Sequence, residues 1–270
     1  QKEGSTTRLE DLISRLGKED MIKMVSNKGA NLLLDNLYQK EGSKTRLEDL
    51  ISRLGQEDMI KMVSNIGANK LLDNLYQKEG STTRLEDLIT RLGKEDMIKV
   101  VSNIGANKLL DNLYQKEGST TRLDDLITRL GKSDMIKMVS NDGSNQLLDN
   151  LYQREGSTTR LENLICQLGK EDMIKMVSND GANKLISYLF YPKQGDLPYN
   201  QLIRLGVSKQ QLFKICARNG STGFLTYLLS KHKGKVVVSY IKHDLDQIIS
   251  FFVRNRGKKT KAYIQTKLPK

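Results

Sequence analysis

The sequence is built on a strict internal repeat of 38 residues. Five copies fill residues 1–190, and they begin at Gln1, Gln39, Gln77, Gln115 and Gln153. Copies two and three differ at only four positions. Because a unit of this size has too little apolar surface to form a core alone, each copy must bury its apolar side against its neighbours. The repeat therefore predicts one structural unit stacked on itself.

The first part of each copy has the spacing of a helix. Leu9, Leu12, Ile13 and Leu16 follow the i, i+3, i+4, i+7 pattern, and Gly17 closes the segment. A threonine followed three residues later by an acidic residue forms a capping box ahead of this helix. The threonines of the five boxes are Thr7, Thr45, Thr83, Thr121 and Thr159.

Two further helices are predicted in each copy. The second runs over residues 19–26 with Met21, Ile22 and Val25 facing inward, and it stops at an Asn-x-Gly loop. The third starts near Ala30 and continues until Gly42–Ser43 breaks it. No segment has the alternating pattern of a strand.

These features predict an all-α fold, an α-solenoid of tandem 38-residue repeats that forms a superhelix with a C-terminal helical cap. We expect five repeats over 1–190 and a degenerate sixth repeat over 191–230, because Leu212–Cys216 matches Met173–Val177. An amphipathic capping helix should lie within 231–254. Residues 255–270 are basic and poor in apolar side chains, which predicts a flexible tail.

The net charge of +12 is unevenly distributed. Residues 1–190 hold 28 basic and 29 acidic side chains, whereas residues 191–270 hold 16 basic and 3 acidic. The basic clusters of the last segment would suit nonspecific phosphate binding, a nuclear targeting signal or an ordinary solvated tail. A wholly disordered chain is excluded because 37% of the residues are hydrophobic and regularly patterned.

The composition argues against an enzyme. The chain has two cysteines, Cys166 and Cys216, and two histidines, His232 and His243, and no arrangement among them suggests a metal site, a cofactor site or an activated nucleophile. So few cysteines favour a reducing compartment, either bacterial cytoplasm or the nucleus of a host. No apolar run reaches the roughly 18 residues of a membrane span, and no signal peptide opens the chain. Since it lacks an initiator Met, we suspect an excerpt from a longer protein.

One loop position changes its chemical character from copy to copy. The five loops all read Ser-Asn-x-Gly, and the variable residues are Lys28, Ile66, Ile104, Asp142 and Asp180. A buried site could not accept a cation, a hydrocarbon and an anion in turn, so this side chain must point out of the core. A tolerant surface loop would explain the variation. So would the reading of bases, because Lys donates to guanine, Asp accepts from cytosine, and Ile makes only apolar contact.

The residues around this loop resemble a known family. Leu54–Leu72 is similar, without a gap, to the first half of a transcription activator-like effector (TALE) repeat. The second half of each copy differs, as it does in the TALE-like proteins of bacteria that are not plant pathogens. The resemblance implies that the residue before the variable one braces the loop through backbone bonds and that the variable residue meets one DNA base in the major groove. The implied braces are Asn27, Asn65, Asn103, Asn141 and Asn179.

The resemblance also implies a target sequence. Lys28, Ile66, Ile104, Asp142 and Asp180 would read 5′-GAACC-3′, and Asn219 in the degenerate copy would add a purine preference. The start of the third helix would face a phosphate with its dipole and its free N–H groups. The implied phosphate-binding residues are Gly29, Gly67, Gly105, Gly143 and Gly181 together with Lys70, Lys108, Gln146 and Lys184. Ordinary solvated lysines are the alternative for these cations.

The expected partner is therefore double-stranded DNA, bound by a monomer without a small-molecule substrate, a cofactor or a membrane. Two alternatives stay open at this point. The first is a protein-binding scaffold of helical repeats. The second is RNA recognition at one base per repeat.

Overall fold

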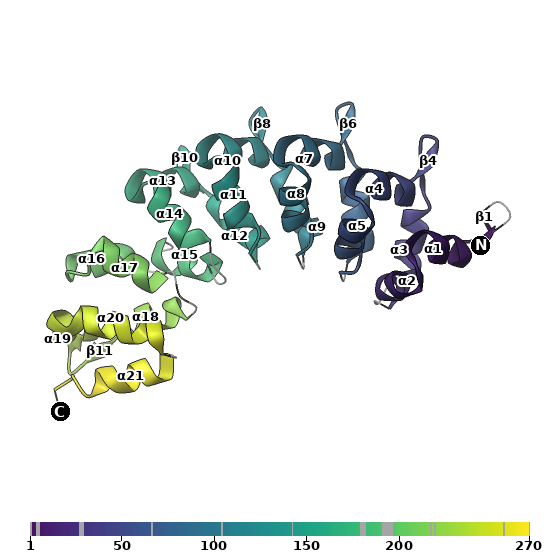
Figure 1. Ribbon diagram of the computed structural model, residues 1–270. Helices are drawn as coiled ribbons and strands as arrows, with labels where there is room; N and C mark the ends of the chain where they lie inside the picture. The colour runs from purple at the N-terminus through teal and green to yellow at the C-terminus, as the bar shows by residue number, and fades with distance from the viewer. Residues whose placement is uncertain are drawn as a thin grey trace. The chain divides into compact units, whose positions relative to one another are not determined.

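The computed structural model describes residues 2–3, 6–26, 30–65, 67–103, 105–141, 143–178, 182–190, 197–216, 218, 220–255 and 257–269. The chain forms two compact units, Gln1–Ser140 and Asn141–Lys270. Helices hold most of the described residues in both units, so the predicted all-α class is confirmed apart from short hairpins (Figure 1). The boundary between the units falls inside the fourth repeat. The predicted composition boundary at Tyr191–Pro192 lies outside the described residues.

The first helix of every repeat begins directly after its capping threonine. In all five copies the threonine hydroxyl accepts from the third helical N–H, and the acidic side chain at that position accepts from the threonine N–H. The predicted capping boxes are thus confirmed. These helices are α1 (Arg8–Leu16), α4 (Arg46–Leu54), α7 (Arg84–Leu92), α10 (Arg122–Leu130) and α13 (Arg160–Leu168).

The second helix follows after a single glycine. Gly17 ends α1 with φ 79° and its N–H donates to the Ile13 carbonyl at 2.9 Å, and the chain then turns into the next helix. This close spacing makes the two helices of a repeat pack on each other. The second helices are α2 (Lys18–Val25), α5 (Gln56–Val63), α8 (Lys94–Val101), α11 (Lys132–Val139) and α14 (Lys170–Val177).

The third helices form the contact between one repeat and the next. In the first unit α6 packs between α3 and α9, and in the second unit α12 packs on α15. They start where the sequence predicts but end earlier, before Tyr38 in the first copy. The third helices are α3 (Ala30–Leu37), α6 (Ala68–Leu75), α9 (Ala106–Leu113), α12 (Ser144–Leu151) and α15 (Ala182–Phe190).

A β-hairpin occupies the Gly-Ser break, so the expectation that no segment is a strand was wrong. Lys40 pairs with Thr45 and Glu41 with Lys44, around a turn in which Gly42 has φ 67°. Strands of two residues are too short to show an alternating pattern. The hairpins of the first unit project from one side of the row of repeats (Figure 1). The strand pairs are β1 (Lys2–Glu3) with β2 (Thr6–Thr7), β3 (Lys40–Glu41) with β4 (Lys44–Thr45), β5 (Lys78–Glu79) with β6 (Thr82–Thr83), β7 (Lys116–Glu117) with β8 (Thr120–Thr121), and β9 (Arg154–Glu155) with β10 (Thr158–Thr159).

The core of each repeat depends on its neighbours. Leu9 and Ile22 in the first repeat are 55% and 46% exposed, whereas their counterparts Leu47 and Ile60 in the second are 0% and 7% exposed. Met24 is fully buried as well, although it was not among the residues predicted to face inward. It faces inward because it lies one helical turn from Met21, on the side that meets the neighbouring helices.

The sixth copy and the cap lie in the second unit. They contain α16 (Pro198–Arg204), α17 (Lys209–Cys216), α18 (Ser221–Leu228), the strands β11 (Lys231–His232) and β12 (Lys235–Val236), α19 (Val237–Ile241), the 3-10 turn η1 (Lys242–Asp244), α20 (Leu245–Arg254) and α21 (Gly257–Gln265). The capping segment packs through Ile248, Ile249 and Phe252, as expected from its spacing.

The structure does not have the flexible tail that we predicted for residues 255–270. Most of this segment is helix α21, which packs on α20 and α18. Thr260 and Ile264 are fully buried, and the Tyr263 ring stacks on Phe251 with 4.7 Å between centroids. Three side chains on one face of α21 are thus enough to hold it, although its overall composition is basic.

Candidate nucleic-acid interface

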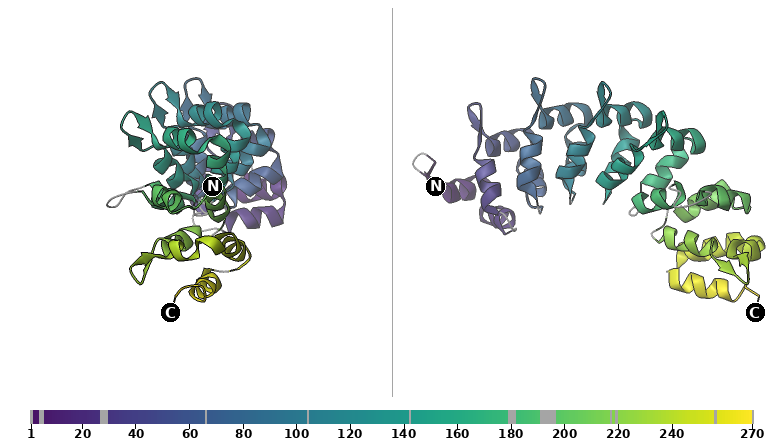
Figure 2. Two further views of the ribbon diagram at one scale, coloured as in Figure 1. Left: turned by 90° about the vertical axis from the view of Figure 1, so that its left-hand side faces the viewer. Right: turned by 180° about the vertical axis from the view of Figure 1, so that it is seen from behind.

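The Asn-x-Gly loops join the second helix of each repeat to the third. The ends of α5 and α8 that lead into these loops lie on the side of the first unit opposite the hairpins (Figures 1 and 2). Gly67 and Gly105 precede the third helices with φ 90° and 87°, a conformation that L side chains rarely adopt. A Cβ built on either glycine would meet no described atom within 4 Å. Backbone conformation, not lack of space, therefore requires glycine, and the start of the helix stays open to a ligand.

The candidate bracing asparagines link consecutive loops. The side-chain amide of Asn65 donates to the Lys61 carbonyl in its own repeat at 3.2 Å and to the Ser102 carbonyl in the next repeat at 2.9 Å. Asn103 repeats the pattern with Lys99 at 3.0 Å and Ser140 at 3.1 Å. Each amide thus ties the base of one loop to the base of the next, which keeps successive loops in the same orientation.

The asparagine backbone also contributes to each loop. Its carbonyl accepts from the first N–H of the third helix, at 3.1 Å from Ala68 to Asn65 and at 3.2 Å from Ser144 to Asn141. The Lys70 N–H donates to the Gly67 carbonyl at 3.0 Å. In the second repeat the N–H groups of Ala68 and Lys70, which we expected to be free for a phosphate, are therefore already bonded. A phosphate at this point would depend more on the helix dipole and on side chains than on those amides.

The third residue of the third helix is exposed in repeats two to five. Lys70, Lys108, Gln146 and Lys184 all point to solvent. Among the described residues, no carboxylate lies within ion-pair distance of the three lysines. The second helices differ, because Lys23 lies 2.8 Å from Asp20 and Lys99 lies 2.8 Å from Asp96. Lys70, Lys108 and Lys184 thus differ from the lysines of the second helices, because no described carboxylate pairs with them.

A buried polar network that the sequence analysis missed sets the spacing of the third helices. The Arg46 guanidinium donates to Asn36 and, at 2.7 Å, to Glu41, and it lies 4.7 Å from the Tyr76 ring centroid. Asn36 in turn donates to the Asn69 carbonyl at 2.8 Å. Since Asn69 precedes Lys70, this bond fixes the turn that carries the exposed lysine. The equivalent residues in the next repeat are Asn74, Glu79, Arg84, Asn107 and Tyr114.

The sequence offered one signal for this network, since an arginine recurs at a fixed position in all five copies and an asparagine at a fixed position in the first four. We attributed neither to a contact because they lie ten residues apart, on either side of the unrecognised hairpin. The hairpin brings them together.

Several predicted site residues lie outside the described residues. They are all six candidate base readers, Lys28, Ile66, Ile104, Asp142, Asp180 and Asn219, together with the braces Asn27 and Asn179 and the glycines Gly29 and Gly181. The description of the interface therefore rests on the loop bases, which the structure does describe in repeats two to four.

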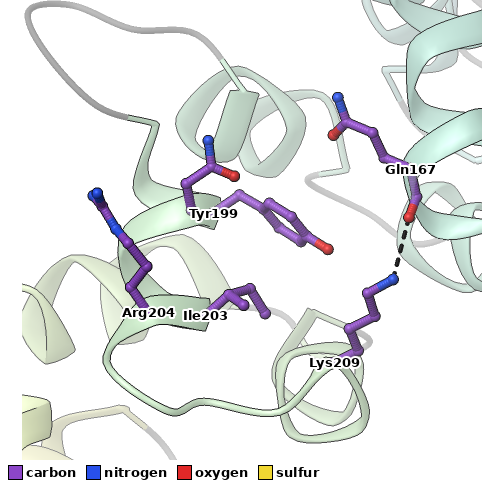
Figure 3. A pocket seen from close by; sticks show the side chains of 6 residues that line it. Gln167, Tyr199, Ile203, Arg204 and Lys209 are labelled. Atoms are coloured by element: carbon purple, nitrogen blue, oxygen red, sulfur yellow. Dashed lines mark hydrogen bonds between the residues drawn. The ribbon is translucent and has the colours of Figure 1, made fainter.

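A cavity in the second unit is lined by side chains of α13, α16 and α17. It has a volume of about 520 Å³ and is lined by Gln167, Tyr199, Asn200, Ile203, Arg204 and Lys209 (Figure 3). The Lys209 ammonium donates to the Gln167 carbonyl at 3.3 Å. The described lining residues include no carboxylate, cysteine or histidine, and the side chains among them that can transfer a proton are those of Tyr199 and Lys209.

The remaining reactive groups are dispersed. Cys166 is exposed and Cys216 is buried, and burial raises the pKa of the Cys216 thiol to about 12. No cluster of three or more His, Cys, Asp or Glu side chains that could hold a metal occurs in the described part of the chain. Of the helices that the structure describes, none is long and apolar enough to cross a membrane.

Comparison with known proteins adds no relative. No family model matches the chain, and no curated protein matches it either.

Proposed function

We propose that the chain binds double-stranded DNA in a sequence-specific manner and that each repeat reads one base in the major groove. The observation that carries the proposal is the set of five Ser-Asn-x-Gly loops, in which only the third residue changes its chemistry. The side-chain bonds from Asn65 to Ser102 and from Asn103 to Ser140 support it, because they keep successive loops in register. A regular series of variable side chains on one side is what a base-by-base reader needs.

The repeats would form an α-solenoid whose superhelix follows the groove. The packing of α3, α6 and α9 on one another favours such an array, since each repeat contacts its neighbours in the same way. With Lys28, Ile66, Ile104, Asp142 and Asp180 as readers, the implied site is 5′-GAACC-3′. Asn219 would add a purine preference from the degenerate copy.

Lys70, Lys108 and Lys184 would hold the DNA backbone beside each base, with Gln146 as a neutral substitute in the fourth repeat. Their exposure and the open space at Gly67 and Gly105 favour a phosphate at the start of the third helix. The positive end of the helix dipole would add to the attraction. In this proposal the protein acts as a monomer and has no catalytic activity.

The proposal predicts that Asp142→Lys moves the preference at the fourth base from cytosine to guanine. On the original duplex the variant should lose about 1–3 kcal/mol of binding free energy. Gel-shift titrations with four duplexes that differ only at this base measure the change. Glu171→Lys is the matched control, because it makes the same charge change at the exposed start of α14, away from any loop.

Equal preference of Asp142→Lys and wild type at the fourth base would contradict base reading. Selection from a pool of random duplexes gives an independent test, in which GAACC should be enriched. A protein-binding scaffold would enrich no duplex, and an RNA reader would bind single-stranded RNA of the same sequence more tightly than the duplex.

A further inference from the structure

The hairpin of the sixth copy has the backbone of a repeat hairpin and a different charge. In the second repeat the Arg46 N–H donates to the Gln39 carbonyl at 2.9 Å, and in the sixth copy the Val237 N–H donates to the Ser230 carbonyl at 2.8 Å. Residues 231–236, hereafter the terminal hairpin, read Lys-His-Lys-Gly-Lys-Val, whereas residues 40–45 read Lys-Glu-Gly-Ser-Lys-Thr. The acidic residue has been lost and cations take up most of the hairpin.

One lysine of the terminal hairpin, Lys231, and one of α21, Lys261, lie near Tyr227. The Lys261 ammonium is 5.4 Å from the Tyr227 ring centroid. Tyr227 also lines a cavity of about 420 Å³ together with Lys231, His232 and Gln265. The His232 ring N–H donates to the Pro269 carbonyl at 3.0 Å, which joins the hairpin to the end of the last helical segment. Lys231, Lys235 and Lys258 are exposed.

Carboxylates do not balance these cations. Residues 197–269 contain 14 basic side chains and only two acidic ones, Asp244 and Asp246. Asp244 lies 3.7 Å from the Lys267 ammonium, and Asp246 accepts from Gln211 at 2.9 Å. The printed partners of both acids thus lie outside the terminal hairpin. The field over this surface is positive, which attracts polyanions.

A membrane would need apolar side chains to insert beneath its headgroups. Among the described residues, the exposed large hydrophobic side chains are all in the first repeat: Leu9, Ile13, Ile22 and Leu32. The surface around the terminal hairpin has the charge but not the apolar face of a membrane-binding surface. A nucleic-acid backbone needs only the charge and the phosphate donors.

We propose that the terminal hairpin and α21 form a second nucleic-acid site that binds the phosphodiester backbone without reading sequence. It goes beyond the base-reading function, because it does not depend on any of the loops. In this proposal the near-neutral repeats determine sequence specificity. The surface formed by the terminal hairpin and α21 supplies most of the salt-dependent part of the affinity. Lysines that contact phosphates release counterions, so each contact adds about 0.9 to the slope of log affinity against log salt.

The test compares binding of the full chain to a duplex without GAACC over a range of salt concentrations. Lys231→Gln with Lys235→Gln should lower the magnitude of the slope by about 2, and the addition of Lys258→Gln, Lys259→Gln and Lys261→Gln should lower it by about 4–5 in total. Lys175→Gln is the matched control, because this exposed lysine lies 3.1 Å from Asp172. Its slope should equal that of wild type.

The fold of each variant is checked by the Cys216 thiol, which is buried in the same unit and should resist a thiol reagent as in wild type. An unchanged slope in the folded five-lysine variant would overturn the proposal. Tighter binding to phosphatidylserine vesicles than to the duplex would also overturn it.

A second measurement separates this proposal from the proposed function. The ratio of affinities for a GAACC duplex and a scrambled duplex reports base reading, and the lysine variants should leave it unchanged. A ratio of one for the wild-type protein would refute base reading. The difference in salt slope between wild type and the lysine variants would still test whether the terminal hairpin binds the DNA backbone.

Discussion

The hairpins of the repeats and the terminal hairpin have the same backbone arrangement but different side chains at equivalent positions. In the second repeat Arg46 is buried and bonds to Asn36 and Glu41. In the sixth copy Val237, Tyr227 and His232 occupy the three equivalent positions. The whole network is replaced together, since any one member left alone would be a buried polar group without its partner.

The same comparison extends to the surface. The arginines of the first helices lie close to carboxylates, as Arg53 does to Asp49 at 2.7 Å and to Glu86 at 2.7 Å. The C-terminal part of the second unit has few acids to match its lysines. In the repeats, oppositely charged side chains therefore pair between neighbouring repeats, whereas the segment around the terminal hairpin has few carboxylates for its lysines to pair with.

The largest effect should follow from breaking the buried network. Arg84→Ala leaves Asn74 and Glu79 without their donor, so we expect a loss of about 2–4 kcal/mol in the free energy of unfolding. Arg91→Ala, on the same helix, removes an exposed arginine and should cost at most about 1 kcal/mol. Urea titrations followed by circular dichroism measure both. Equal losses would show that the buried network adds nothing beyond surface ion pairs.

An intermediate effect is expected at the capping box. Thr83→Val removes the hydroxyl that accepts from the Glu86 N–H and should cost about 1 kcal/mol. Val236, which precedes α19 in the cap, has no such bond to lose. Thr82→Val, one residue earlier on an exposed side chain, is the control and should be close to neutral. A loss at Thr82 as large as that at Thr83 would contradict the capping role.

The smallest change in the free energy of unfolding per group should come from protonation of single carboxyl groups as the pH falls. The Thr83 N–H bond to Glu86 and the Lys94 ammonium beside Asp58 hold the pKa of each carboxyl below its ordinary value. A lowered folded pKa gives stability that is present above the ordinary values of 4.5 and 3.8 and is lost as pH falls through the folded values. Unfolding titrations from pH 6 downward should show this loss. It should shrink in Lys94→Gln, where Asp58 keeps only weaker partners, and an unchanged loss would contradict the assignment.

Periodicity and capping residues predicted the helices well because both are local. The start of α6 at Ala68 and the capping box at Thr45 follow from neighbours within four residues. The hairpins were not predicted because strands of two residues are too short to show an alternation of apolar and polar side chains. The helix α21 escaped it because only Thr260, Tyr263 and Ile264 face the core.

The candidate interface likewise has features that the sequence predicts and features that only the structure shows. The variable loop residues and their bracing asparagines can be found from the sequence, because repetition marks what changes and what does not. The bond from Asn65 to Ser102 of the next repeat and the bond from Asn36 to Asn69 could not be found, since both join residues more than thirty positions apart.

The sequence by itself determined the repeat, the helices, the loop position that varies and the excess of positive charge near the C-terminus. Only the tertiary structure decided which cations are matched by carboxylates, which arginines are buried and where the terminal hairpin meets α21. Local patterns are set by contacts between residues close along the chain. Charge matching depends on which distant side chains the packing of repeats brings within about 4 Å.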